Sequence, residues 1–491
     1  MSSKRATEQN TLTTTIGILA RRFGFDALRS EQEPVVDRLV AGESALVVWP
    51  TGSGKSLCYQ LPGLTRAAQN PDAPGVTLVF SPLIALMEDQ VAALRKKDIR
   101  AQYINSTLSR KERDKRYEKL ARGDYEIIYA TPERMLKPEF VDALRTIPGG
   151  VNLLAVDECH CVTKWGHDLR PAYQRVGEFR HQLGDPVTVA LTATATKEVR
   201  DDVRRVLGLS ESEMSLFAQP IDRPNLALEA EDSWDDEDKI KRIERTCAEF
   251  DGTGIVYFAL IKDLDRMSDL IRRRLPGWTV RKYHGKLRPD EKKRIYREFI
   301  DARPEDKLLL CATNAFGMGV DKPDIRFIIH AQVPGSVEAY YQEVGRAGRD
   351  GKPSACRLLY SQDDLAIQQQ FTEWKNPGAA LKEEIVRVMV FSDHADFDAD
   401  ELRLEVLGKT GQSGIFEHAL IALADMGIVE PTSVTDAQPR YRFVREPEPG
   451  EIDETSIAEK RQRDLMRLLS VVEMVKSDDI ASHVNTYFQL D

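Results

Sequence analysis

Short apolar runs alternate with amphipathic stretches over the first 360 residues of the chain. Apolar runs bounded by glycine, proline or polar residues are typical of strands. In the first half they predict strands at 44–49, 76–80, 101–104, 126–129, 153–156 and 188–191. In the second half they predict strands at 254–258, 279–283, 307–311, 326–330 and 355–360. The stretches between them, such as 84–97 and 110–121, are amphipathic. This alternation predicts an α/β fold with an open, mostly parallel sheet in each half and helices on both faces.

The pattern changes after about residue 380, where two helical stretches, 398–408 and 413–431, precede the short β-prone segment 440–444. This order fits either a winged-helix variant or a small, mainly helical packing module. The acidic segment 229–239 between the two halves is expected to be a surface loop. We therefore expect three domains, with boundaries at 1–210, 211–375 and 376–491.

Composition indicates a globular chain, because 42% of the 491 residues are hydrophobic and 30% are charged. No apolar run reaches the length of about 18 residues that a membrane span needs. The first ten residues are polar, so we expect no signal peptide and a cytoplasmic protein, in the cytoplasm or nucleoid of a bacterium. The six cysteines form no C-x-x-C pair and none follows Cys356, which argues against a disulfide framework or a cysteine-rich zinc site.

The net charge of −10 does not indicate general attraction to nucleic acid. Basic clusters occur at 94–97, 109–116, 271–275 and 290–297. Such clusters are either solvated helix faces or parts of a local binding groove.

The segment VVWPTGSGKSLCYQ, residues 47–60, has the composition of a phosphate-binding loop. An apolar strand runs into a glycine-rich turn, and a helix follows. In this geometry backbone N–H groups and the helix N-terminus point at phosphates. Lys55 would reach the β- and γ-phosphates, and the Ser56 hydroxyl would hold Mg²⁺. The remaining residues of the turn are Thr51, Gly52, Ser53 and Gly54. Trp49 stands where the usual signature has its first glycine, so the rest of the chain has to decide whether the loop binds nucleotide.

Two further groups carry the residue types that ATP hydrolysis needs. Asp157 and Glu158 follow an apolar strand, where Asp157 could hold Mg²⁺ and Glu158 could orient and deprotonate the attacking water. In the second half, YYQEVGRAGRDG supplies Gln342, Arg346 and Arg349, which could reach across a cleft to the γ-phosphate. The alternatives are a turn of solvated acids and a basic surface turn. A phosphate loop needs a metal-binding carboxylate, so the two motifs in the first half support each other.

The motifs PTGSGKS, DECH, LTATAT, ATNAFGMGVDKPDIRFIIH and QEVGRAGRDG have the order and spacing of superfamily 2 helicases. More narrowly, the chain resembles the RecQ family of DNA helicases over about residues 14–370. That resemblance is carried by FGFDALRSEQEPVV (23–36), SPLIALMEDQ (81–90) and DECHCVTKWGHDLRPAY (157–173). It implies two tandem RecA-like lobes, and it removes the objection raised by Trp49, because superfamily 2 loops do not require the first glycine.

The resemblance also implies roles for further residues. Arg29 and Gln32 would read adenine, Phe25 would stack nearby and Asp321 would touch the ribose. His160 would link the state of the ATP site to DNA, and Thr192 and Thr194 could hydrogen-bond across the lobes. The residues expected to contact or sense single-stranded DNA are Ser81, Trp165, His167 and Arg170.

Two features depart from the family pattern. Leu169 stands where an aromatic residue is usual, and the cysteines of the family's zinc module are missing after the second lobe. We expect ATP and Mg²⁺ but no zinc. The leading hypothesis is an ATP-dependent helicase that moves 3′ to 5′ on single-stranded DNA and unwinds tailed or branched duplexes, and we expect a monomer. The alternatives are an RNA helicase and an ATP-regulated DNA-binding or remodelling subunit without strand separation.

Overall fold

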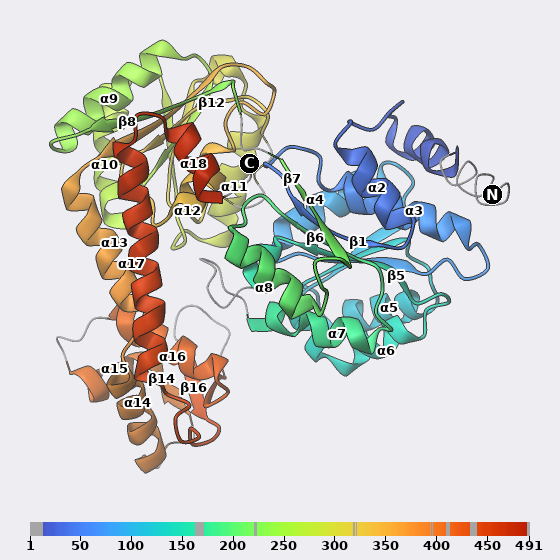
Figure 1. Ribbon diagram of the computed structural model, residues 1–491. Helices are drawn as coiled ribbons and strands as arrows, with labels where there is room; N and C mark the ends of the chain where they lie inside the picture. The colour runs from blue at the N-terminus through green and yellow to red at the C-terminus, as the bar shows by residue number, and fades with distance from the viewer. Residues whose placement is uncertain are drawn as a thin grey trace.

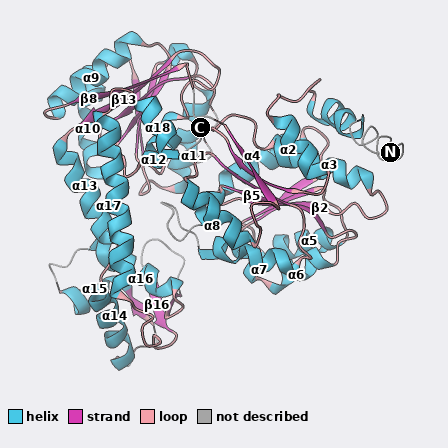
Figure 2. Cartoon of the chain, in the orientation of Figure 1, coloured by secondary structure: helices cyan, strands magenta, loops and turns pink. Residues whose placement is uncertain are grey.

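A computed structural model describes residues 13–162, 171–219, 223–317, 320, 322–392, 394, 396–408, 413–432 and 439–488. Two α/β lobes lie side by side, and a smaller module projects from the second lobe (Figure 1). Helices cover both faces of the sheet in each lobe (Figure 2). The expected α/β fold with two RecA-like lobes and a mainly helical C-terminal part is confirmed.

The first lobe contains a seven-stranded parallel sheet with the strand order β3-β4-β2-β5-β6-β1-β7. Its strands are β1 (Ser44–Val48), β2 (Val76–Phe80), β3 (Ala101–Ile104), β4 (Ile127–Ala130), β5 (Val151–Asp157), β6 (Thr188–Thr192) and β7 (Met214–Ala218). Its helices are α2 (Gln32–Val40), α3 (Leu57–Gln69), α4 (Ile84–Arg95), α5 (Arg110–Ala121), α6 (Pro138–Arg145), α7 (Val176–Gln182) and α8 (Lys197–Leu207). Short helical turns are η1 (Leu19–Phe23), η2 (Pro132–Leu136), η3 (Cys159–Val162) and η4 (Pro171–Arg175).

Strand β1 explains why these strands appear in the sequence as continuous apolar runs. Leu46 and Val48 pack into the core on one face of the sheet, and Ala45 and Val47 into the core on the other. Successive side chains of a strand point to opposite faces, so a strand covered on both sides is apolar at every position.

The second lobe contains a six-stranded parallel sheet with the order β10-β11-β9-β12-β13-β8. Its strands are β8 (Leu226–Asp232), β9 (Thr253–Tyr257), β10 (Thr279–Tyr283), β11 (Leu308–Ala312), β12 (Ile325–His330) and β13 (Ser354–Tyr360). Its helices are α9 (Asp236–Glu249), α10 (Ile261–Arg274), α11 (Pro289–Asp301), η5 (Pro304–Asp306), α12 (Val337–Val344) and α13 (Gln362–Lys375).

The structure corrects the expected surface loop at 229–239. Residues 229–232 belong to the edge strand β8, and α9 begins at Asp236. Leu226 and Leu228 on one face of β8 pack against the core, whereas Glu231 on the other face pairs with Arg242 and Arg245 of α9. Acidic residues therefore alternate with apolar ones, as in a half-exposed strand.

Strand β7 also departs from the expected organisation. It pairs with β1 at the edge of the first sheet, although it lies beyond residue 210. We therefore propose that the first lobe extends to about Ala218 and that the second begins near Leu226.

The C-terminal module has the topology of a winged helix. Its elements are α14 (Ala379–Phe391), β14 (Phe397–Asp398), α15 (Ala399–Leu407), α16 (Ser413–Asp425), β15 (Val429–Pro431) and β16 (Arg440–Phe443). The strands form an antiparallel sheet in the order β14-β16-β15. The module has its own apolar core, which includes Ile385, Leu402, Phe416, Leu420 and Ile428.

Two helices return from this module to the second lobe. Helix α17 (Glu454–Lys476) packs along α13 and reaches α12, and α18 (Ile480–Phe488) follows it (Figure 1). At the module end, the Lys460 ammonium donates to the Lys375 carbonyl and to Asn376 Oδ1, both at 3.1 Å. Asn376 Nδ2 donates to Asp464 Oδ2 at 2.9 Å. The module is therefore attached to the second lobe by an antiparallel helix pair.

No helix within the described ranges combines the length and the apolar content needed to cross a membrane.

All six cysteines are buried and free of disulfides. Burial raises the pKa of Cys311 to about 11 and the pKa values of Cys58 and Cys356 to about 12. Because the thiolate is the reactive form, these thiols are protected by both protonation and packing.

We therefore expect almost no reaction of the native protein with a thiol reagent such as DTNB at pH 8, and reaction of all six thiols after unfolding in guanidinium chloride. Absorbance of the released chromophore measures both. Rapid modification of the native chain would show that one of the lobe cores opens readily.

Candidate active site

The phosphate loop connects β1 to α3. Gly52 and Gly54 have φ values of 81° and 85°, in the left-handed region that favours glycine. The Trp49 N–H continues the sheet by donating to the Thr192 carbonyl at 3.1 Å, and its side chain is only 1% exposed in the core below. The position of the usual first glycine is thus occupied here by an extension of the strand, and the tight turn begins only after it.

Lys55 is folded back onto its own loop. Its ammonium donates to the carbonyl oxygens of Trp49 and Pro50 at 2.8 and 3.1 Å. Burial lowers the pKa of Lys55, and the carboxylates of Glu158 and Asp157 oppose that shift. To bind a β- or γ-phosphate, the ammonium has to exchange these two carbonyl oxygens for phosphate oxygens.

The predicted adenine-reading residues lie on the other side of the loop. Gln32 Nε2 donates to the Gly54 carbonyl at 3.2 Å, and Arg29 Nη1 donates to the Ser53 carbonyl at 3.0 Å. Gln32 Oε1 accepts from the Arg29 N–H at 3.1 Å. Phe25 is 51% exposed, and the Lys97 ammonium lies 5.9 Å from the centroid of its ring. Gln32 and Arg29 are therefore hydrogen-bonded directly to the backbone of the phosphate loop.

The acid pair stands at the carboxyl end of β5, beside Lys55. Burial raises the pKa of Asp157, the nearby Lys55 ammonium opposes this shift, and Asp157 Oδ1 accepts from the Glu158 N–H at 3.0 Å. Glu158 has a φ of 50°, which is unusual for a residue with a side chain and is a form of strain found at functional sites. A carboxylate and a serine hydroxyl are the hard oxygen ligands that suit Mg²⁺, and Asp157 and Ser56 supply these two groups.

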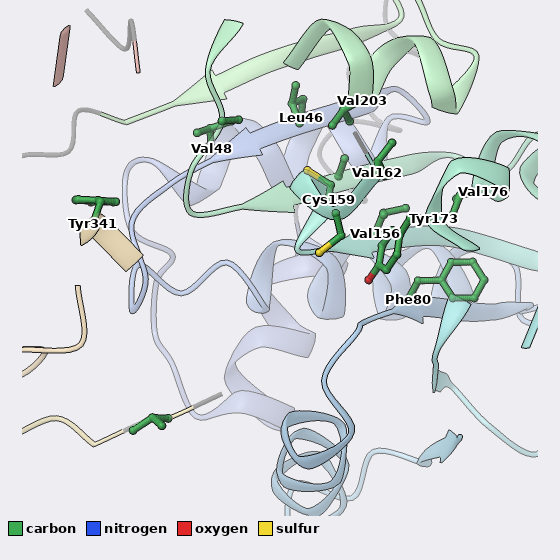
Figure 3. Packing of buried hydrophobic residues seen from close by; sticks show 14 of the residues in the cluster. Leu46, Val48, Phe80, Val156, Cys159, Val162, Tyr173, Val176, Val203 and Tyr341 are labelled. Carbon is green, nitrogen blue, oxygen red and sulfur yellow. The ribbon is translucent and has the colours of Figure 1, made fainter. Parts of the chain in front are cut away.

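The segment after the acid pair is fixed by the core of the first lobe. Cys159 and Val162 are fully buried and pack in the same core as Val203 of α8 (Figure 3). The Tyr173 hydroxyl donates to the Asp157 carbonyl at 3.1 Å. Tyr173 is a positioning residue that the sequence motifs did not reveal, because only the fold brings its side chain under the acid pair.

A chain of polar contacts leads from Glu158 to the second lobe. His160 Nδ1 lies 3.3 Å from Glu158 Oε2 and 2.8 Å from Thr192 Oγ1. The Thr192 hydroxyl donates to the Thr194 carbonyl at 3.0 Å, so we assign His160 Nδ1 as the donor to Thr192. Gln342 Nε2 on α12 then donates to Thr194 Oγ1 at 3.3 Å. Of these two threonines, Thr194 and not Thr192 bonds directly to the second lobe.

The arginine-bearing turn of the second lobe meets the phosphate loop. Thr51 Oγ1 donates to the Gly345 carbonyl at 3.1 Å. A Cβ on Gly345 would lie 2.8 Å from that hydroxyl, so only glycine allows this approach. The side-chain carbons of Arg349 lie 3.6 Å from the position of a Cβ on Gly52. Arg349 thus lies across the cleft, against the phosphate loop.

Both arginines are oriented by the loop that follows β11. Arg349 Nη1 donates to the Val320 carbonyl at 2.8 Å, and Arg346 Nη1 donates to the Gly317 carbonyl. Arg346 is 6% exposed and lies farther inside the second lobe, whereas Arg349 is closer to the loop. The two arginines therefore contact different surroundings, although the sequence suggested equivalent roles.

The remaining predicted residues are less informative. Ser81 is buried at the end of β2, where its hydroxyl accepts from the Leu83 N–H at 3.5 Å. Asp321, Trp165, His167 and Arg170 lie outside the described residues, as does Leu169. The described residues contain no group of three or more His, Cys, Asp or Glu side chains that could hold a metal ion.

Comparison with known proteins identifies the family. The model of the DEAD/DEAH box helicase family matches residues 29–202, and that of the helicase conserved C-terminal domain matches residues 238–351. The chain is 38% identical over 375 residues to the probable ATP-dependent DNA helicase RecS of Bacillus subtilis, covering 76% of this chain and 72% of that protein. The chain belongs to the RecQ family of superfamily 2 helicases.

A second relative supports this assignment. The ATP-dependent DNA helicase RecQ of Bacillus subtilis is 40% identical over 387 residues, which cover 77% of this chain and 61% of that protein. The chain thus spans less than two thirds of the length of that RecQ helicase.

Solved structures with the same fold include helicases bound to either nucleic acid. The DUF1998 helicase MrfA bound to DNA has a TM-score of 0.58 and 21% identity, over 88% of this chain and 62% of MrfA. Dbp5 of S. cerevisiae bound to RNA and ADP–BeF₃ has a TM-score of 0.55 and 20% identity, over 72% of this chain and 89% of Dbp5. At these identities the likeness shows the fold of this RecQ-family chain and does not distinguish DNA from RNA.

Replacement of Lys55 by alanine tests the phosphate loop. We expect Lys55→Ala to abolish ATP hydrolysis, because the loop loses the side-chain cation that would meet the phosphates. We also expect the free energy of unfolding to fall by about 1–3 kcal/mol, because the carbonyl oxygens of Trp49 and Pro50 lose their donor.

Phosphate release and denaturant unfolding measure the two effects. Lys262→Ala, at an exposed position of α10, is the matched control and should change neither. Wild-type turnover by Lys55→Ala would contradict the assignment of this loop.

Proposed function

We propose that this RecQ-family chain is an ATP-dependent DNA helicase whose ATP site is the cleft between its two lobes. The observation that carries the proposal is the contact of Arg349 and Gly345 with the phosphate loop. Residues from both lobes are needed to surround the triphosphate, so binding and hydrolysis of ATP can change how the lobes are held together.

Each residue of the cleft has a distinct part in the proposed reaction. Mg²⁺, held by Ser56 and Asp157, would neutralise charge on the phosphates. Glu158 would accept a proton from the attacking water, and the bond from its N–H to Asp157 Oδ1 holds its backbone beside the metal-binding carboxylate. Lys55 and Arg349 would stabilise the charge that develops on the γ-phosphate from the two lobes.

The polar chain from Glu158 through His160 to Thr194 and Gln342 supports coupling between hydrolysis and lobe movement. A change at the carboxylate alters the hydrogen bond that His160 can make, and the path ends at a bond between the lobes. We propose that DNA contacts made by Trp165, His167 and Arg170, eight to thirteen residues after Asp157, enter the same path.

Single-stranded DNA and tailed or branched duplexes are the proposed substrates, and 3′ to 5′ is the proposed direction. The support for DNA over RNA is the membership of the RecQ family and the motif at 157–173. Such a protein would work in the compartment that holds the DNA, the cytoplasm and nucleoid of a bacterium, and we propose that it acts as a monomer.

The charge of the winged-helix module favours a second candidate, an ATP-regulated DNA-binding or remodelling subunit that does not separate strands. Residues 376–450 contain 7 Lys and Arg against 14 Asp and Glu. Proteins that bind the phosphate backbone of a duplex neutralise it with lysine and arginine. An acidic module is therefore poorly suited to hold a duplex against the motor lobes.

A substrate panel separates these functions. We expect ATP hydrolysis to be stimulated by single-stranded DNA more than by RNA of the same sequence. We also expect ATP-dependent strand release from 3′-tailed and forked duplexes, and none from blunt or 5′-tailed ones. Phosphate release and a fluorophore–quencher duplex are the measurements.

Glu158→Gln is the matched variant, because it keeps the shape of the side chain and removes the proton acceptor. It should bind ATP while hydrolysis falls by about a hundredfold or more, and strand release should stop with it. DNA-stimulated hydrolysis without strand release from any duplex would favour the remodelling subunit. Stronger stimulation by RNA would favour an RNA helicase.

A further inference from the structure

Helix α18 touches both lobes, although it follows the winged-helix module in the chain. Figure 1 shows it on the second lobe, beside α12, on the side that faces the first lobe. The Phe488 side chain is fully buried, and Val484 and Ile480 are buried one and two helical turns earlier. The helix is thus packed into the protein along one face.

The contact with the second lobe is made on α12. The Tyr487 hydroxyl donates to Glu338 Oε1 at 2.8 Å, and Glu338 is only 7% exposed. The ring of Phe488 lies 5.9 Å from that of Tyr341. Tyr341 immediately precedes Gln342, so Phe488 packs on the turn of α12 that presents Gln342 to the first lobe.

The contact with the first lobe is made by Arg200 of α8. Its Nη1 donates to the Phe488 carbonyl at 3.1 Å and to the Ala195 carbonyl at 3.3 Å. Phe488 is the last residue of α18, where carbonyl groups lack helical partners and a cation is favourable. Ala195 follows Thr194, which accepts the bond from Gln342. The segment 194–195 of the first lobe is therefore joined to α12 in two ways. Thr194 bonds directly to Gln342, and Ala195 is connected through Arg200 to Phe488, which packs on α12.

We propose that α18 is an interlobe clasp, in which Tyr487 and Phe488 are positioning residues that hold α12 and the following arginine turn against the phosphate loop. The partners of Tyr487 and Phe488 on the two lobes are Glu338, Tyr341 and Arg200, which lie outside the phosphate loop, so the clasp should act with or without nucleotide. The position of the lobes without nucleotide does not depend on the proposed function. Only the expected effect on the KM for ATP rests on the proposed ATP cycle. Part of the free energy needed to bring the lobes together comes from α18, and less has to come from bound ATP.

Interlobe distance in the absence of nucleotide is the direct test. Dyes at Arg110→Cys on α5 and Lys262→Cys on α10 report energy transfer between the lobes, and the buried native thiols leave these two positions free to be labelled selectively. Phe488→Ala should lower the transfer efficiency relative to wild type. Tyr487→Phe, which removes only one hydroxyl, should lower it less.

Thr486→Ala is the matched control, because Thr486 is an exposed residue of the same helix, and it should leave the efficiency unchanged. Saturating AMPPNP should restore the wild-type efficiency in Phe488→Ala, which separates lobe opening from misfolding. In the same variant the KM for ATP should rise about fivefold or more, as expected for a lost coupling contact.

Unchanged transfer efficiency in both Phe488→Ala and Tyr487→Phe would overturn the clasp, even if their activity fell. If AMPPNP failed to change the transfer efficiency of Phe488→Ala while its lobes stood apart, the clasp would stand and the proposed ATP cleft would be wrong. The two proposals therefore fail in different ways.

Discussion

The bond from Thr51 to the Gly345 carbonyl, with Arg349 packed on Gly52, is the contact on which the rest of the cleft depends. Neither lobe alone has both a phosphate loop and an arginine that can face it. The contact requires the backbone of Gly345 to approach a threonine hydroxyl more closely than a side chain would allow. The absence of a side chain at Gly345 is thus a steric condition for joining two separately folded sheets into one site.

Charge sets the second constraint. Lys55, Asp157, Glu158 and Arg349 bring two positive and two negative groups into one half-buried region, where each sign partly compensates the other. The pKa shifts show this balance, because burial raises the pKa of Asp157 and lowers that of Lys55, and each group opposes the shift of the other. The bonds from Lys55 to two carbonyl oxygens satisfy its ammonium within the protein. When phosphate binds, the Lys55 ammonium would therefore exchange these two carbonyl oxygens for phosphate oxygens, and it would not have to leave bulk water to do so.

Much of this arrangement could be predicted from sequence, because a strand covered on both faces is apolar throughout and because phosphate loops and acid pairs are short local motifs. Strand β8 could not, since its alternation of apolar residues and glutamate was obscured by the acidic run that continues into α9. The fold-back of Lys55, the placement of Tyr173 and the contacts of Phe488 could not either. They depend on side-chain directions and on residues far apart in the chain, which a local pattern does not encode.

The helix pair α13 and α17 connects the winged-helix module rigidly to the second lobe, so movements of that lobe are transmitted to the module. A helix of 23 residues such as α17 is about 35 Å long. It is packed against the second lobe at one end and bonded to residues 375 and 376 at the other, so it behaves as a lever fixed to that lobe. A rotation of about 10° at the base of such a lever displaces its tip by about 6 Å. A small rotation of the second lobe during the ATP cycle would thus displace the winged-helix module by several ångströms.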